Sequence, residues 1–154
     1  MLLYIFVYTP LKKITWLNTT IGAIPGAMPA LGGWAASANA LDPNAWILFS
    51  ILFLWQHPHF YAIALMCKED YKKAGFQMLP VIENESNRTN RQILWHAFLL
   101  IPVSLFFVVT GILGEIYFWG ASALGFGYLI SGVPLLRNTT FDNAKLLLKT
   151  SVIY

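Results

Sequence analysis

The sequence consists of long apolar runs separated by shorter polar stretches. Complete runs cover residues 19–41, 45–67, 93–113 and 116–136, and partial runs cover 1–8 and 144–154. Each complete run meets the requirement of about 20 residues for a helix that crosses a bilayer. The pattern predicts an all-α membrane protein, a multi-span helical bundle formed by one transmembrane domain over residues 1–154. Because both partial runs look cut, we expect a domain truncated at both ends.

The first complete run differs from the others in its many helix-breaking and small residues. These are Gly22, Pro25, Gly26, Pro29, Gly32 and Gly33. A break in backbone hydrogen bonding is tolerated in a membrane only where the helix is wrapped by protein or lines a cavity. Small residues also allow two helices to pack closely. Both interpretations, cavity lining and close packing, stay open from the sequence.

Composition supports the membrane interpretation and excludes other classes. Of 154 residues, 57% are hydrophobic and only 11% are charged, whereas soluble domains have about 25% charged residues. No basic run with interleaved polar residues is present, so nucleic acid is not an expected partner. The single cysteine, Cys67, excludes an internal disulfide and a cysteine-based metal cluster. We interpret it as a small apolar residue of a buried helix.

The placement of charge predicts a topology. All ten Lys and Arg residues fall in alternate loops or within one turn of them. The only charged residues of the opposite loops are Asp42 and Glu115. The positive-inside rule places the basic loops in the cytoplasm, or in the matrix of an organelle. We therefore expect a multi-pass protein, in a bacterial plasma (inner) membrane rather than a mitochondrial inner membrane.

Polar groups interrupt the second complete run at Gln56, His57 and His59. Such groups are costly in a bilayer and are functional candidates. His57 and His59 are two residues apart, so on a regular helix they point to nearly opposite faces and cannot chelate one metal together. His59 and Asp70 are eleven residues apart, which places them on one face about 16 Å apart along the axis. Each histidine can also be a core residue bonded to a neighbouring helix, the interpretation that we favour for His96.

Two charged clusters are predicted to face the same compartment. One is Lys12-Lys13, followed by Asn18, and the other is the stretch 68–73, Lys-Glu-Asp-Tyr-Lys-Lys. Lysines can bind diphosphate oxygens as point charges, and a carboxylate can hold the same group through Mg²⁺. Together they can stabilise the leaving group of an allylic diphosphate. The alternative is that these lysines reach the membrane interface without a ligand and that Glu69 and Lys73 form a surface pair.

Three stretches also carry a resemblance to a known family. The main one contains Leu54-Trp55-Gln56, Pro58-His59-Phe60, Asp70-Tyr71, Ala74-Gly75 and Met78-Leu79-Pro80. The others are residues 8–18, Tyr-Thr-Pro-Leu-Lys-Lys-Ile-Thr with Asn18, and residues 22–34, which begin Gly-Ala-Ile-Pro-Gly-Ala-Met-Pro. In order and spacing they resemble the UbiA-type intramembrane prenyltransferases, in their branch of protohaem IX farnesyltransferases (haem O synthases). The similarity covers nearly the whole chain, and residues 142–151 fit it more weakly.

The resemblance implies transfer of a farnesyl group from farnesyl diphosphate to a vinyl carbon of haem b, with Mg²⁺ on the diphosphate. Asp70 would belong to the second acidic motif of the family. The candidate residues are, for catalysis, Asp70 (also the Mg²⁺ ligand through the diphosphate), Lys68 and Tyr71; for diphosphate binding, Lys12, Lys13, Asn18 and Lys72; and for haem, His57 and His59. A downstream haem A synthase or cytochrome oxidase assembly factors are expected partners.

Two departures from the family pattern matter. Many members have a second carboxylate four residues after the first, where this chain has Ala74; haem O synthases share that change. The first Asn/Asp-rich motif is absent and would lie upstream of Met1, so we expect this chain alone to be inactive.

Two other classes compete with the enzyme. A transporter half also has helices broken by Gly and Pro, but it needs ionisable groups near mid-span, and here the carboxylates lie at span ends. A structural haem-binding subunit needs axial ligands on facing helices, for which only His57 and His59 qualify.

Overall fold

The computed structural model describes residues 9–154, so the partial run expected at 1–8 lies outside the described residues. The helices of the described part are α1 (Thr9–Leu11), α2 (Asn18–Ala38), α3 (Pro43–Met66), α4 (Lys68–Lys73), α5 (Leu79–Ile82), α6 (Asn87–Val109), α7 (Glu115–Gly132), α8 (Pro134–Arg137) and α9 (Phe141–Ile153). No strand occurs in residues 9–154. The predicted all-α class is confirmed.

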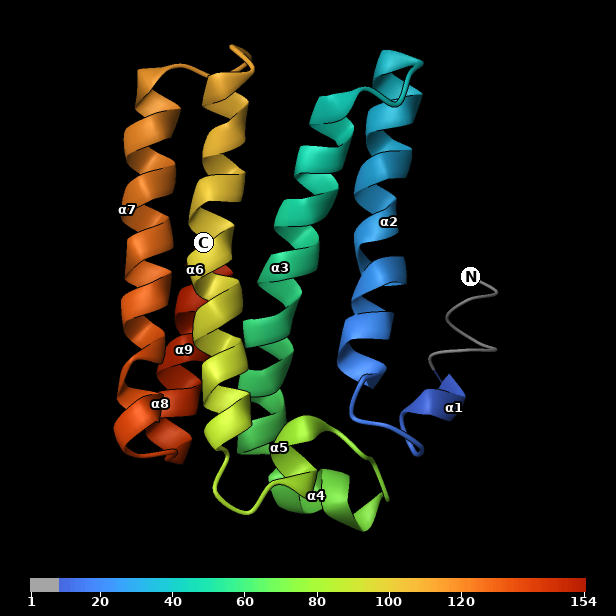
Figure 1. Cartoon of the computed structure of the whole chain (residues 1–154), viewed down its shortest axis with the longest axis vertical. Helices are drawn as coiled ribbons and strands as arrows, with labels where there is room; N and C mark the ends of the chain where they lie inside the picture. The colour runs from blue at the N-terminus through green and yellow to red at the C-terminus, as the bar shows by residue number, and fades with distance from the viewer. Residues whose placement is uncertain (1–8) are drawn as a thin grey trace.

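The long helices form a bundle around α3 (Figure 1). Helix α3 packs against α2, α6 and α9, and α7 packs against α6 and α9. A helix that is apolar on all sides is typical of the centre of a bundle, and α3 has this composition over most of its length. Its buried side chains include Leu54, Tyr61 and Ala62. The helix that carries the polar groups of the second run is therefore held on three sides by other helices.

Local signals explain where α3 begins. The Asp42 carboxylate accepts hydrogen bonds from the backbone N–H groups of Asn44 and Ala45, at 2.9 and 3.2 Å, and Pro43 occupies the first helical position. An acidic cap followed by proline satisfies free N–H groups at a helix start. Asp42 and Pro43 thus set the start of α3 just before the apolar run at residue 45.

The polar stretch between the second and third complete apolar runs is ordered into α4, α5 and the first turn of α6. Helix α6 begins six residues before the apolar run at 93 because a carboxylate supports its first turn. Glu83 Oε2 accepts hydrogen bonds from the Thr89 backbone N–H at 3.0 Å and from the Thr89 hydroxyl at 2.7 Å. This interaction crosses a turn, and hydrophobic periodicity does not reveal it.

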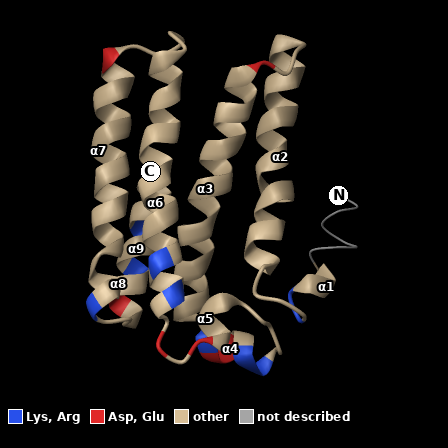
Figure 2. Ribbon diagram, in the orientation of Figure 1, with Lys and Arg blue, Asp and Glu red and all other residues tan. Residues whose placement is uncertain are grey.

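Three helices of the described part are long and apolar enough to cross a membrane: Pro43–Met66, Asn87–Val109 and the continuous stretch Glu115–Arg137. Large apolar side chains on the outer face, such as Trp119 and Val109, are mostly exposed. Figure 2 shows the Lys and Arg residues gathered at one end of the bundle, with acidic residues at the starts of α3 and α7 at the other end. Asp42 caps the start of α3, and Glu115 is the first residue of α7. The surface is thus that of a membrane protein with one basic end.

Candidate functional site

A pocket of about 270 Å³ lies where α2, α3 and α4 meet at the basic end. Its lining combines polar side chains near the loops with glycines and an aromatic ring further in. The lining residues are Lys12, Asn18, Thr19, Gly22, Gly26, Gln56, Phe60, Tyr71, Phe76 and Met78. The two charged clusters predicted to face one compartment therefore meet at one pocket, through Lys12 and Tyr71.

Backbone hydrogen bonds between distant loops build the polar end of this pocket. The Gln77 N–H donates to the Lys12 carbonyl at 2.7 Å. The buried Asn18 side chain donates from Nδ2 to the carbonyls of Gln77, at 3.2 Å, and Thr15, at 2.6 Å. The Lys12 ammonium lies 5.8 Å from the centroid of the Phe76 ring. Asn18 thus fixes the loop that carries Lys12, while Lys12 itself lines the pocket.

A left-handed glycine returns the chain from α4 to this pocket. Gly75 has φ +72°, and the N–H groups of Gly75 and Phe76 donate to the carbonyls of Lys72 and Tyr71, each at 3.0 Å. This pair of bonds is a Schellman motif, which favours glycine because a side chain is strained at such φ. The motif brings Phe76 and Gln77 against the Lys12 loop.

Helix α4 divides its side chains between the pocket and solvent. Tyr71 lines the pocket with its ring 5.6 Å from that of Phe76. Burial raises the pKa of the Tyr71 hydroxyl, and the nearby Cys67 thiol adds to this effect. The hydroxyl therefore stays protonated around neutral pH and can donate a hydrogen bond. Asp70 is exposed on the same short helix and does not line the pocket.

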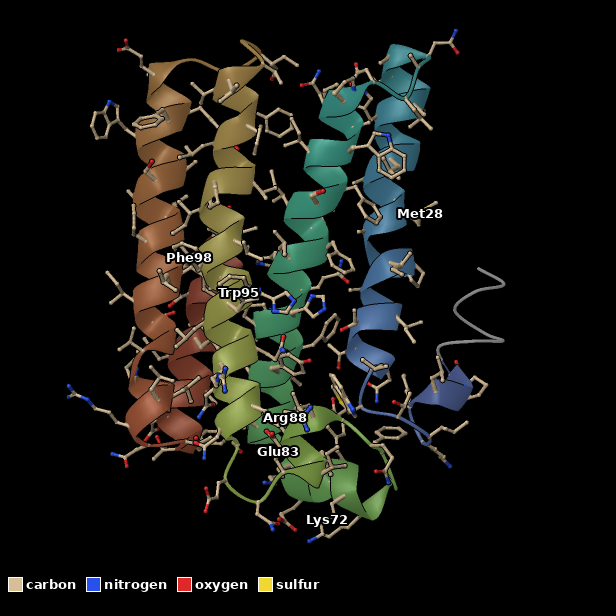
Figure 3. All side chains as sticks on the ribbon, in the orientation of Figure 1. Met28, Lys72, Glu83, Arg88, Trp95 and Phe98 are labelled. Atoms are coloured by element: carbon tan, nitrogen blue, oxygen red, sulfur yellow. The ribbon has the colours of Figure 1, made fainter. Side chains whose placement is uncertain are left out.

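The lysines assigned to the site lie in different surroundings. The Lys68 ammonium donates to the Glu83 carbonyl at 2.7 Å and so ties α4 to the end of α5. Lys13 is exposed on the α1–α2 loop, and Lys72 is exposed on α4, where Figure 3 labels it at the basic end. Lys12 is the lysine that the structure places in the lining of the pocket.

His57 is fully buried between α2 and α6, with both ring nitrogens engaged. Nδ1 lies 2.8 Å from the Phe53 carbonyl and Nε2 lies 3.2 Å from the Thr20 hydroxyl. A carbonyl only accepts, so Nδ1 donates and Nε2 accepts from Thr20. The ring also stacks on His96, with centroids 4.0 Å apart. These contacts join three helices and place His57 outside the lining of the pocket.

His59 points to α9, on the other side of α3. Its Nδ1 lies 2.8 Å from the Ser151 hydroxyl, which itself donates to the Leu148 carbonyl at 2.6 Å. Ser151 has one proton to give, so His59 donates. Trp55 stacks on the His59 ring and donates to the Ser151 carbonyl at 2.7 Å. The two histidines do lie on opposite faces, and the structure does not bring His59 and Asp70 into the described pocket.

The sequence marked Gln56 as a functional candidate without a specific role and did not single out Phe60, and these are the α3 residues that line the pocket. Gln56 is only 7% exposed, its Nε2 donates to the Leu52 carbonyl, and its amide packs on Gly26 so closely that a methyl group there would collide with it. The i, i+4 spacing of Gln56 and Phe60 was the available signal. Both interpretations of the Gly- and Pro-rich run, cavity lining and close packing, therefore apply to Gly26. It lines the pocket and permits the close approach of the Gln56 side chain.

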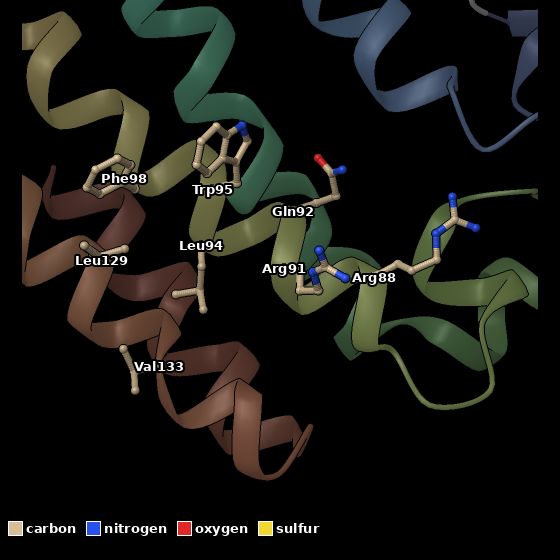
Figure 4. A pocket seen from close by; sticks show the side chains of 8 residues that line it. All are labelled: Arg88, Arg91, Gln92, Leu94, Trp95, Phe98, Leu129 and Val133. Carbon is tan, nitrogen blue, oxygen red and sulfur yellow. The ribbon is translucent and has the colours of Figure 1, made fainter.

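A larger groove of about 680 Å³ runs along α6 and α7 and was not foreseen from the sequence. It is lined by Arg88, Arg91, Gln92, Leu94, Trp95, Phe98, Leu129 and Val133. Figure 4 shows the two arginines at one end and the apolar side chains along the rest. Arginines at the start of a span were counted only as topology signals.

The described residues contain no group of three or more His, Cys, Asp or Glu side chains able to hold a metal ion. A Mg²⁺ ion bound with a diphosphate needs only one or two carboxylates, because phosphate oxygens and water supply the other ligands. Asp70, exposed on α4, can supply one such carboxylate.

Comparison with known proteins identifies the family of this chain. The UbiA prenyltransferase family matches residues 1–153. Curated relatives named protoheme IX farnesyltransferase include those of Solibacter usitatus, 52% identical, and Salinibacter ruber, 44% identical, each over 98% of this chain. The chain spans about half the length of these relatives, 52% and 53% respectively. No solved structure matches. This chain belongs to the UbiA prenyltransferase family.

Proposed function

We propose that the protein transfers a farnesyl group from farnesyl diphosphate to the vinyl group of haem b, giving haem O. The observation that carries this proposal is the pocket in which Lys12, Asn18 and Tyr71 meet at the basic end while Gly22, Gly26 and Phe60 continue between α2 and α3. A pocket with a polar end near the loops and with Phe60 further in suits a prenyl diphosphate. We infer the acceptor from the relatives, which are named protoheme IX farnesyltransferase.

The chain's own residues would act mainly by binding and orientation. Lys12 would neutralise negative charge that grows on the diphosphate as the allylic C–O bond breaks, a form of electrostatic stabilisation that is large in a site shielded from water. The protonated Tyr71 hydroxyl would donate to the same oxygens. The prenyl chain would run past Gly22 toward Phe60, while the Gln56 amide fills the space beside Gly26.

Asp70 and Mg²⁺ complete the proposal. Bound Mg²⁺ would offset the charge of the diphosphate leaving group. Asp70 would hold the metal through one carboxylate, with the diphosphate as co-ligand. Lys68, Lys72 and Lys13 would add positive charge around the polar end. His57 and His59, predicted as haem ligands, have protein partners in the described structure, and their role toward haem stays a prediction.

Membership of a prenyltransferase family does not support the transporter alternative. The family and the apolar helices identify a membrane protein, and the bacterial relatives favour a bacterial plasma membrane. Haem A synthase and cytochrome oxidase assembly factors remain proposed partners.

The test is direct. The complete gene product, in purified membranes, is given haem b, farnesyl diphosphate and Mg²⁺, and haem O is measured by chromatography and mass spectrometry. We expect haem O that depends on both substrates. If farnesyl diphosphate is consumed without haem O, the acceptor is wrong; if neither changes, the proposal fails.

A further inference from the structure

The groove on α6 and α7 is separate from the pocket of the prenyl chain, and its lining is divided by polarity. Its arginine end lies at the basic end of the bundle. Further along α6, the rings of Trp95 and Phe98 stack with centroids 6.1 Å apart. Leu129 and Val133 form the α7 side. The groove therefore suits an amphiphile with an anionic end and a broad apolar body.

The lining of the groove contains two arginines, Arg88 and Arg91, and no Asp or Glu. Arg88 has Glu83 nearby, at 3.8 Å, but its side chain is 63% exposed. Glu83 Oε2 is engaged by Thr89. Arg91 is exposed, and no ion pair joins it to a residue within 9–154. Arg88 and Arg91 are three residues apart on α6, so they present two guanidinium groups on successive turns.

The groove also lies next to the prenyl diphosphate pocket. The Arg88 guanidinium lies 5.1 Å from the centroid of the Trp16 ring. Trp16 is two residues before Asn18, which lines that pocket. Arg88 therefore connects the groove to the loop that carries Lys12. A compound bound in the groove would have one edge close to the farnesyl donor.

We propose that this groove binds the acceptor through its carboxylates, with Arg88 and Arg91 on two carboxylates and Trp95 and Phe98 against a flat apolar ring system. This rests on the proposed function, in which the acceptor, protohaem, is a flat dicarboxylate. Guanidinium groups pair with carboxylates through two parallel hydrogen bonds, and aromatic rings favour stacked or edge-on contact with a flat partner. The volume falls within the range of about 300–1,000 Å³ for small-molecule sites.

A phospholipid is the competing occupant, because its phosphate would also seek arginine. Two guanidinium groups and a pair of stacked rings fit a rigid dianion better than one phosphate with two flexible chains. If haem b is the occupant, removal of its carboxylate charges should weaken its binding to the groove. If a phospholipid is the occupant, loss of the arginines should instead release the lipid and leave haem b binding unchanged.

The complete gene product in detergent is titrated with haem b and with its dimethyl ester, which keeps the ring but lacks both carboxylate charges. Binding is followed by the absorption change of the porphyrin. We expect Arg88→Gln and Arg91→Gln each to weaken haem b binding about 10-fold or more, the usual effect of losing a hydrogen bond to a charged group. The ester should bind all three proteins alike. Arg137→Gln, an exposed arginine of α8 outside the groove, is the matched control and should bind haem b normally.

Other results would overturn the proposal. Unchanged haem b affinity in the double variant would place the carboxylates elsewhere, and equal loss of haem b and ester would indicate a damaged fold. If the variants instead lose copurifying anionic phospholipid, as measured by mass spectrometry, and keep haem b, the groove is a lipid site. These binding assays need no turnover, so a failed haem O assay with intact arginine-dependent binding would reject the transfer reaction and not the groove.

Discussion

Asp70 is the residue on which the proposed chemistry depends most. It is exposed on α4, and no ion pair with a described residue holds it, so its carboxylate is available to a metal–diphosphate complex. Asp70→Asn keeps the shape and removes the charge. We expect haem O formation by the complete protein to fall about 10²–10³-fold, the usual effect of losing one well-placed electrostatic stabiliser.

The measurement is turnover against Mg²⁺ concentration, with protein level and haem b binding as checks. Glu69→Gln removes the adjacent exposed carboxylate and serves as the control, with turnover within a few-fold of the parent. Near-normal turnover and unchanged Mg²⁺ dependence in Asp70→Asn would show that Asp70 does not act in the reaction. The lysines of residues 68–73 would then only lie at the membrane interface, without a ligand.

His59 is either a haem ligand or a structural contact between helices. A variant of its hydrogen-bond partner, Ser151, distinguishes these two roles. His59→Ala and Ser151→Ala each remove one side of the 2.8 Å hydrogen bond between α3 and α9. Loss of a buried partner costs about 1–3 kcal/mol, so both variants should unfold at lower temperature, by similar amounts. If His59 acts only as this contact, haem b affinity will change equally in both. A selective loss of haem b binding in His59→Ala would instead support the role predicted from the sequence.

At the scale of elements, the turn after α4 controls how the pocket closes. Gly75 has φ +72°, a conformation that costs a residue with a side chain roughly 1–2 kcal/mol. We expect Gly75→Ala to weaken binding of a non-hydrolysable farnesyl diphosphate analogue several-fold, because Phe76 and Gln77 would no longer meet the Lys12 loop. Calorimetry of binding, with thermal unfolding alongside, measures both effects.

Gly127→Ala is the matched control, because Gly127 has ordinary backbone geometry in α7 and open space around it. It should leave analogue binding unchanged. Equal affinity in the Gly75 variant would mean that the loop contact does not shape the pocket.

Elements with local signals were predictable, and those held by distant partners were not. Asp42 starts α3 because its own next residues supply the N–H groups, so the sequence alone places this start. The start of α6 depends on Glu83, which acts across a turn, and was predicted six residues late. The pocket was foreseen as two charged clusters on one side of the membrane, but its inner wall was not. Which α3 side chains face inward follows from packing on α2 and α9, and no local pattern fixes it.

At the scale of the whole molecule, the polarity of the two ends predicts orientation. Asp42 and Glu115 stand at the starts of α3 and α7, and these helix starts lie at the end opposite the Lys and Arg residues (Figure 2). We expect single cysteines at these positions, in a Cys67→Ala background, to react with a membrane-impermeant reagent added outside intact cells. A cysteine at the exposed Lys73 position should react only after permeabilisation. The reverse labelling pattern would place the site on the outer side of the membrane.

The bond between the Gln77 N–H and the Lys12 carbonyl also bears on how the protein is made. Its partners are separated in the chain by the whole of α2 and α3, so this end of the pocket cannot exist until both helices have been inserted and the next loop has left the ribosome. Insertion can be finished while the site is still unformed. The nascent chain is therefore inserted in the membrane before it has this binding site. The ability to bind the diphosphate through the pocket appears only after the loop that contains Gln77 has been made. If only one of α2 and α3 crossed the bilayer, residues 12 and 77 would lie on opposite sides, and such copies would be unable to bind the diphosphate through this pocket.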